Sequence, residues 1–186
     1  MIPEKIGCIF DMDGVLFLSS EIHYQAYCEA LAAEPVEVLD YRELSGMRTD
    51  SAIQKIFNKS GIVLNPEKLQ ELVSRKRGFA SEMLRKQPPV ATDCNKVIAE
   101  FYRRGIPMAL ASSSSSQNVQ LFLESSGTRN FFSVILSGDD VKNAKPDPEI
   151  FRIARTCFGI LPEFCFVIED SESGIRSAQA DGMKVI

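Results

Sequence analysis

The chain has 186 residues, of which 45% are hydrophobic and 25% are charged. These proportions are typical of a globular protein and exclude a largely disordered chain, and the length suffices for one substantial core or for one core with a small appendage. The 21 basic and 25 acidic side chains give a net charge of -4, so there is no general electrostatic case for nucleic-acid binding.

No apolar run approaches the roughly 20 residues of a membrane span, and Glu4 and Lys5 stand where a signal peptide would build its apolar region. We therefore expect a cytoplasmic protein that does not bind a membrane. The five cysteines are scattered without a CxxC pair, which favours reduced thiols over disulfides or a zinc site. His23 is the only histidine, which excludes a multi-histidine metal site and argues against a Ser-His-Asp triad.

The first predicted element is a buried strand over residues 6–10, an apolar run that stops at Asp11, Asp13 and Gly14. The stretch that follows contains no convincing strand. Its apolar spacing predicts helices over 21–31 and 50–59, and a third that runs from Pro66 to about residue 83. The consecutive prolines at 88 and 89 cannot continue a helix and end this helical block.

Beyond the two prolines, predicted helices and strands alternate. Helices are expected over 93–104, 119–123, 149–158 and 174–180, and strands over 106–111, 132–136, 164–168 and 183–186. This alternation favours an α/β fold with a parallel sheet covered by helices on both faces. We expect residues 18–88 to form a helical cap domain, inserted into a core made of residues 1–17 and 89–186.

Polar side chains follow the carboxyl ends of several predicted strands, and these ends meet at one edge of a parallel sheet. Taken singly, each has an ordinary alternative, such as capping a helix or lying in a solvated loop. Their occurrence together and in this order favours one site. The residues are Asp11 and Asp13, Ser112 with Ser113, Lys145, and Glu169 with Asp170.

Four carboxylates at one edge would repel one another and raise each other's pKa values unless positive charge is present. A Mg²⁺ ion and one lysine ammonium would supply that charge. Mg²⁺ prefers oxygen ligands and usually binds one or two carboxylates together with a substrate phosphate. The sequence therefore predicts a site for a phosphoryl group and, as partner, a small phosphorylated metabolite.

These segments resemble, in order, the four motifs of the haloacid dehalogenase-like (HAD) hydrolase superfamily. The matching residues are Asp11-Met12-Asp13-Gly14-Val15, Ser112, Lys145-Pro146-Asp147-Pro148 and Glu169-Asp170-Ser171. Within the superfamily, the chain is similar to the branch of β-phosphoglucomutase and the small sugar-phosphate phosphatases. The resemblance covers nearly the whole length and implies the HAD fold, a Rossmann-like parallel sheet core with an inserted all-helical cap.

The resemblance also implies roles for the site residues. Asp11 would be the nucleophile that forms an aspartyl-phosphate, and Asp13 would act as general acid and base. Ser112, Ser113 and Lys145 would bind the phosphoryl oxygens. Mg²⁺ would be held by Asp11, the main-chain carbonyl of Asp13 and Asp170, with Glu169 close by.

The cap residues bear on whether water or a sugar hydroxyl accepts the phosphoryl group. His23 stands where β-phosphoglucomutases have a histidine that helps link cap closure to acid/base positioning, and Arg48 and Lys76 lie in segments that resemble those holding the sugar and its second phosphate. A substrate-binding role is expected for all three, although packed or solvated positions remain open. Departures from the mutase pattern, Leu18 among them, favour hydrolysis of a small phosphorylated metabolite such as a sugar phosphate. The alternatives are a phosphoglucomutase-type mutase and a non-catalytic binding module; as oligomeric state we expect a monomer or a small homo-oligomer.

Overall fold

A computed structural model of the chain describes residues 5–186. Within this range the strands form one five-stranded sheet in the order β3-β2-β1-β4-β5, and every pairing is parallel. The predicted α/β fold with a parallel sheet is confirmed. The strands are β1 (Gly7–Phe10), β2 (Met108–Ala111), β3 (Val134–Leu136), β4 (Cys165–Ile168) and β5 (Lys184–Val185).

The helices occur where the sequence predicts them, with shifts at their ends. Three short 3-10 helices, which the apolar pattern did not indicate, connect some of the elements. The α-helices are α1 (Ser20–Leu31), α2 (Thr49–Lys59), α3 (Pro66–Lys86), α4 (Cys94–Arg103), α5 (Ser116–Ser126), α6 (Glu149–Phe158) and α7 (Glu172–Ala180). The 3-10 helices are η1 (Tyr41–Glu43), η2 (Arg129–Phe131) and η3 (Pro162–Phe164).

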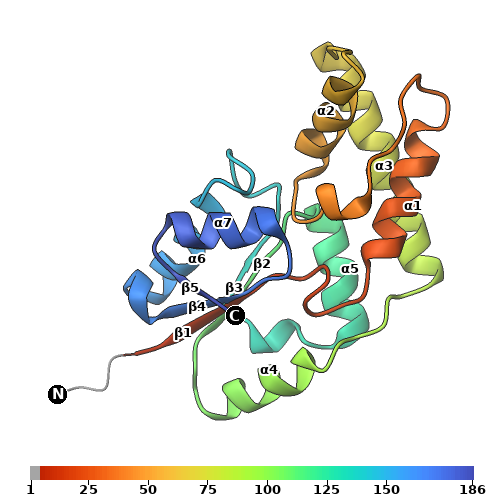
Figure 1. The fold of residues 1–186 in the computed structure, drawn as a ribbon. Coiled ribbons are helices and arrows are strands. Elements are labelled where there is room, and N and C mark those ends of the chain that lie inside the picture. The colour runs from red at the N-terminus through yellow and green to blue at the C-terminus, as the bar shows by residue number, and fades with distance from the viewer. Residues whose placement is uncertain (1–4) are drawn as a thin grey trace.

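Two helical layers cover the sheet, α4 and α5 on one face and α6 and α7 on the other (Figure 1). Because side chains alternate along a strand, Phe10 of β1 packs with Phe122 of α5, whereas its neighbour Ile9 packs with Phe151 of α6. Both faces of β1 are therefore buried. This explains why the strand reads as a continuous apolar run rather than an alternating one.

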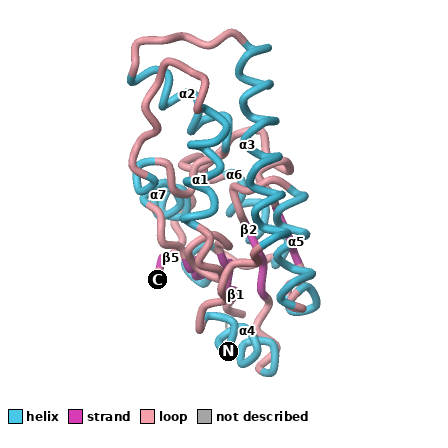
Figure 2. The backbone as a smooth tube through the Cα atoms, turned by 90° about the vertical axis from the view of Figure 1, so that its right-hand side faces the viewer, coloured by secondary structure: helices cyan, strands magenta, loops and turns pink. Residues whose placement is uncertain are grey.

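Helices α1, α2 and α3 lie beyond the carboxyl ends of the strands and pack on one another (Figures 1 and 2); we call them the cap. Ile53 and Phe57 of α2 meet Leu72 of α3 in a cluster separate from the two beside the sheet. The division of the chain at residues 18 and 88 remains a prediction.

Two element boundaries differ from the sequence prediction for identifiable reasons. Strand β2 begins at Met108 rather than at residue 106, since Pro107 has no N–H to donate and its carbonyl accepts a hydrogen bond from the amide of Cys8 instead. Helix α5 begins at Ser116, earlier than expected, because Ser115 caps it: the Ser115 side chain accepts from the amide of Asn118.

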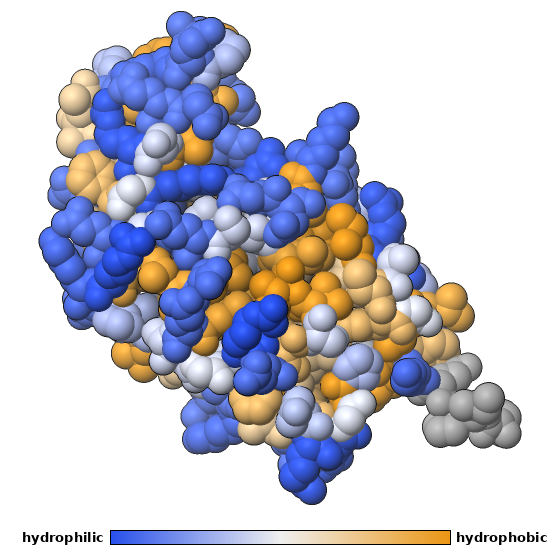
Figure 3. Space-filling model, turned by 180° about the vertical axis from the view of Figure 1, so that it is seen from behind, coloured by the Kyte–Doolittle hydropathy of each residue, from blue (hydrophilic) through white to orange (hydrophobic). Residues whose placement is uncertain are grey.

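The surface differs between the two ends of the molecule. Viewed from behind, the cap end is mainly hydrophilic, whereas apolar side chains gather over the end that contains the sheet (Figure 3). In the described part of the chain, all five cysteines are free thiols. None of the helices within residues 5–186 combines the length and apolar character needed to cross a membrane.

Candidate active site

The carboxyl ends of the strands bring three charged side chains into contact. Lys145 Nζ lies 2.7 Å from Asp11 Oδ1 and 2.8 Å from Glu169 Oε2, and it also donates to the carbonyl oxygen of Ala111 at 3.2 Å. Asp11 follows β1, Glu169 follows β4, and all three charged side chains are buried. The sheet thus joins one cation to two carboxylates that are remote in sequence.

Burial and charge act against each other in this group. For Lys145, burial lowers the pKa, but the carboxylates of Asp11 and Glu169 outweigh it and hold the pKa above its usual value. For Asp11, burial and then the charge of Glu169 raise the pKa, although Lys145 opposes both. One ammonium does not compensate two buried carboxylates, so the group favours a further positive charge.

A metal ion fits this excess of negative charge. One carboxylate oxygen from each of Asp11, Glu169 and Asp170 lies within 4.8 Å of the others. Glu169 is already engaged, since Oε2 accepts from Lys145 while Oε1 accepts from the amide and hydroxyl of Ser171 at 3.1 and 2.6 Å. Burial and then the charge of Glu169 raise the pKa of Asp170 to about 6. The donor set is all oxygen, which suits Mg²⁺.

Gly14 lets the loop after β1 approach the carboxylate of Asp170 closely. Gly14 has φ +88°, and a Cβ atom there would lie 2.1 Å from Oδ2 of Asp170. Only glycine adopts this backbone conformation without strain and leaves the required space. The Asp-x-Asp-Gly sequence therefore provides both the carboxylates and the close contact between the loops after β1 and β4.

Asp13 has a different environment from Asp11. Its Oδ1 accepts from Ser19 Oγ at 2.6 Å and lies 3.0 Å from His23 Nε2, and its Oδ2 accepts from Ser114 Oγ at 2.7 Å. Burial alone would raise the pKa of Asp13, but His23 and these hydroxyls outweigh it and hold the pKa well below its usual range. Asp13 is therefore a carboxylate in the arrangement seen here.

Behind His23 lies a buried lysine of the cap. Lys76 Nζ is 3.1 Å from His23 Nδ1 and 4.5 Å from the centre of the Tyr27 ring. A lysine ammonium can only donate, so Nδ1 accepts and the ring proton resides on Nε2, where it is donated to Asp13. Burial lowers the pKa of Lys76 to about 8.

The predicted phosphate and substrate ligands are distributed differently. Ser112 Oγ accepts from the amide of Ser114 at 3.0 Å and lies 3.4 Å from Asp13 Oδ2. Ser113 Oγ donates to the carbonyl oxygen of Gly46 in the cap at 2.7 Å. Arg48 does not line the cavity next to Asp11 and Asp13. Its guanidinium binds the loop after β3 instead, while its side chain lies beside Ser113 and Lys145.

Four further residues near Asp11 and Asp13 were not identified from the sequence as site residues. Ser19 and Ser114 bind Asp13, and Tyr27 and Tyr41 line the cavity between cap and core. The serine run after β2 could have indicated Ser114, since several hydroxyls there compete for the same site. Nothing in the local pattern singled out the two tyrosines, whose apolar rings are also suited to packing.

The cavity between the cap and the two aspartates, Asp11 and Asp13, has a volume of only about 30 Å³, roughly that of one water molecule. Asp11 and Asp13 line it from the core, and His23, Lys76 and Tyr41 line it from the cap side. A hollow of about 650 Å³ on the outer rim, next to Glu172, carries none of the catalytic carboxylates. The structure is therefore a closed form, and a sugar-sized ligand must enter by movement of the cap.

The model of the family described as haloacid dehalogenase-like hydrolase matches residues 8–186. A phosphorylated carbohydrates phosphatase of Thermotoga maritima is 32% identical over 184 residues, which cover 96% of this chain and 82% of the relative. A β-phosphoglucomutase of Bacillus subtilis is 29% identical over 184 residues, covering 94% and 79%. The crystal structure of a mutant CbbY from Rhodobacter sphaeroides in complex with xylulose-1,5-bisphosphate superimposes with a TM-score of 0.84 at 28% identity, covering 97% of this chain and 84% of the other.

Proposed function

Because the chain belongs to the haloacid dehalogenase-like hydrolases and is a phosphatase of that family, we propose that it hydrolyses small sugar phosphates with Mg²⁺ through an aspartyl-phosphate. The observation that carries the proposal is the contact of Lys145 with both Asp11 and Glu169. A carboxylate oxygen of Asp170 lies within 4.8 Å of oxygens of these two residues. The relative named as a phosphorylated carbohydrates phosphatase supports the substrate class, as does the CbbY structure in complex with a sugar bisphosphate.

In the first step, Asp11 attacks the phosphorus atom and the sugar oxygen leaves. Lys145 lowers the cost of bringing a second anion to the Asp11 carboxylate, and Ser112 donates to a phosphoryl oxygen. Asp13 delivers a proton to the leaving oxygen. Because Asp13 is ionised in the closed form without substrate, it must take up that proton as the substrate binds.

In the second step, water attacks the phosphorus atom of the aspartyl-phosphate and Asp13 accepts a proton from that water. The bond between phosphorus and the Asp11 oxygen breaks, which releases inorganic phosphate and restores the Asp11 carboxylate. The three hydrogen bonds from Ser19, Ser114 and His23 fix the carboxylate of Asp13 for this role. Asp11 and Asp170, with the main-chain carbonyl of Asp13, would hold Mg²⁺, and Glu169 orients Lys145 and the loop after β4. When bound, Mg²⁺ offsets the charge that gathers on the phosphoryl oxygens.

Replacing Asp11 by Asn tests the proposal, because the amide keeps the shape of the side chain but cannot act as the nucleophile. We expect phosphate release from sugar phosphates to fall roughly a thousandfold or more, and EDTA to abolish release by the unaltered protein until Mg²⁺ is restored. The matched control is Asp93→Asn, since Asp93 is exposed and pairs with Lys96. Full activity of Asp11→Asn would contradict the nucleophile assignment, and full activity in EDTA would contradict the metal.

Transfer to a sugar hydroxyl is the second candidate. The contacts from Lys76 through His23 to Asp13 favour it, because they link the position of the cap to the proposed acid and base, as a mutase that excludes water requires. A binding module without turnover has less support, since binding alone needs neither Asp13 nor its three hydrogen-bond donors. The products formed from a hexose phosphate distinguish the three functions: hydrolysis releases free phosphate, transfer gives an isomeric hexose phosphate, and a binding module gives neither.

A further inference from the structure

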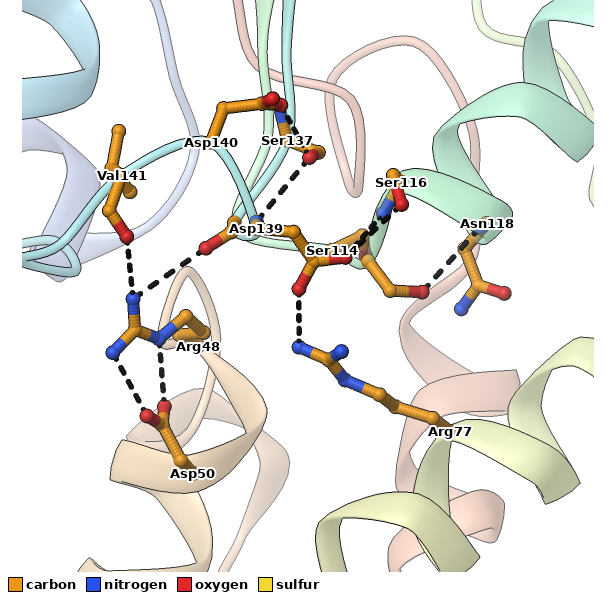
Figure 4. A network of polar contacts seen from close by, with 12 residues as sticks. Arg48, Asp50, Arg77, Ser114, Ser116, Asn118, Ser137, Asp139, Asp140 and Val141 are labelled. Atoms are coloured by element: carbon orange, nitrogen blue, oxygen red, sulfur yellow. Dashed lines mark hydrogen bonds and ion pairs between the residues drawn. The ribbon is translucent and has the colours of Figure 1, made fainter. Parts of the chain in front are cut away.

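The loop that follows β3, residues 137–142, is bound by two arginines of the cap (Figure 4). We call it the β3 loop. Arg48 immediately precedes α2, and Arg77 lies in α3. The two side chains approach the loop from different cap helices, although the loop belongs to the sheet end of the molecule.

Arg48 uses both edges of its guanidinium. Nη1 donates to the carbonyl oxygens of Val141 at 3.0 Å and Lys142 at 3.2 Å, with Gly138 more distant at 3.5 Å. Nε and Nη2 form a bidentate pair with Asp50 at 2.9 and 2.8 Å. Among residues 5–186, the side chains that line the catalytic cavity do not include Arg48.

Arg77 binds a carboxylate that the core already holds in place. Its Nη2 donates to Asp139 Oδ1 at 2.8 Å, while Asp139 Oδ2 accepts from the amide and hydroxyl of Ser116 at 2.9 and 3.1 Å. Asp140 in turn accepts from the amide and hydroxyl of Ser137. These bonds lie within the core, so the core by itself supplies contacts that hold the shape of the β3 loop.

We propose that Arg48 and Arg77 are positioning residues that hold the cap closed by binding the β3 loop, and that Arg48 does not bind a substrate phosphate. The proposal rests on the proposed function in taking a closed cap, with the cavity enlarged around the substrate, as the form in which chemistry occurs. The guanidinium donors of Arg48 bind the β3 loop and Asp50, although the side chain also lies beside Ser113 and Lys145.

The strength of these contacts suits repeated opening. Hydrogen bonds from a guanidinium are charge-assisted and therefore strong. The side chains of Arg48 and Arg77 are, however, 20% and 31% exposed, and water and salt weaken ion pairs and hydrogen bonds at such partly exposed positions. The cap can therefore open in each turnover. Loss of either arginine lowers the fraction of closed molecules and hence the apparent affinity for any substrate.

Hydrogen exchange without substrate tests the proposal independently of catalysis. In Arg48→Ala and in Arg77→Ala we expect the amides of residues 137–142 and 44–50 to exchange several-fold faster than in the unaltered protein. The matched control is Arg42→Ala, because Arg42 is exposed and its side chain pairs with Asp40 rather than with the β3 loop. Unchanged exchange in both variants would overturn the proposal, even if the protein proved not to be a phosphatase.

Kinetics separate a closing residue from a phosphate ligand. Both alanine variants should raise KM about threefold to tenfold for sugar monophosphates and bisphosphates alike, with kcat changed less than about twofold. Arg77→Lys should restore much of the affinity, since one ammonium can reach Asp139. Arg48→Lys should not, because one ammonium cannot bind both the β3 loop and Asp50 as the guanidinium does. A loss confined to Arg48 variants and to bisphosphates would overturn the proposal.

Discussion

Two aspartates that stand two positions apart have opposite electrostatic environments in this site. Asp11 faces Lys145 and Glu169, and burial and Glu169 raise its pKa. Asp13 faces His23, Ser19 and Ser114, which together hold its pKa low. Because β1 ends at Phe10 and the chain then turns instead of continuing as a strand, a single short motif places one carboxylate beside Lys145 and the other beside His23 of the cap.

Lys76 gives a prediction at the same scale. Its pKa of about 8 lies below the ordinary value of 10.5 because the side chain is buried. Below pH 8 the lysine is charged in both the folded and the unfolded chain. Between pH 8 and 10.5 the unfolded chain binds a proton that the folded one does not, so the free energy of unfolding should rise with pH, by about 3 kcal/mol in total.

Urea unfolding at pH 7.5, 9 and 10.5 measures this contribution. In Lys76→Met the rise should be missing, so the unaltered protein gains stability relative to the variant as the pH increases. Lys86→Met is the control, because Lys86 is exposed and its loss should leave the pH dependence unchanged. A constant difference between Lys76→Met and the unaltered protein at all three pH values would contradict the prediction.

At the scale of the elements, Gly14 sets the distance between the loops after β1 and β4. In Gly14→Ala the new Cβ would meet Asp170 at 2.1 Å, so Asp170 must move away from Asp11. We expect the Mg²⁺ concentration for half-maximal activity to rise about tenfold or more, since a Mg²⁺ site tolerates little displacement of its ligands. The positive φ should also cost about 1 kcal/mol of stability.

Gly61→Ala separates these two effects. Gly61 has φ +71°, and a Cβ there would meet no atom within 4 Å. Both variants should lose similar stability in thermal unfolding, whereas only Gly14→Ala should require more Mg²⁺. Equal Mg²⁺ requirements in the two variants would show that the close approach of Gly14 to Asp170 is not needed for binding Mg²⁺.

The parts of the site that were predictable are those fixed by strand ends. Asp11, Lys145 and Glu169 each follow an element whose apolar pattern is clear, and parallel topology then brings them together. The serine run after β2 could have indicated Ser114, whereas the contacts of Ser19 and of the two arginines were not predictable, because they depend on how the cap lies on the core. Arg48 shows the difference: its position in the sequence suggested a phosphate ligand, and its place between two elements turns it towards backbone carbonyls.

At the scale of the whole molecule, the fit of cap and core bears on the fate of the phosphoryl group. The closed cavity of about 30 Å³ must enlarge to admit a sugar, and Lys76, the cation that lines it from the cap, already binds His23. Arg48 is engaged with the β3 loop. A mutase must turn a bisphosphate over inside the closed site, and among residues 5–186 no arginine lines the cavity that would receive its second phosphate.

One reaction therefore distinguishes hydrolysis from transfer. The protein is given β-glucose 1-phosphate, Mg²⁺ and a trace of glucose 1,6-bisphosphate, and free phosphate and glucose 6-phosphate are followed together. We expect phosphate without glucose 6-phosphate from this or another hexose phosphate, because water meets less competition in the site than a second phosphorylated sugar does. Asp11→Asn should release neither product. Formation of glucose 6-phosphate without phosphate would mean that the cap excludes water and holds the bisphosphate, and the enzyme would then be a mutase.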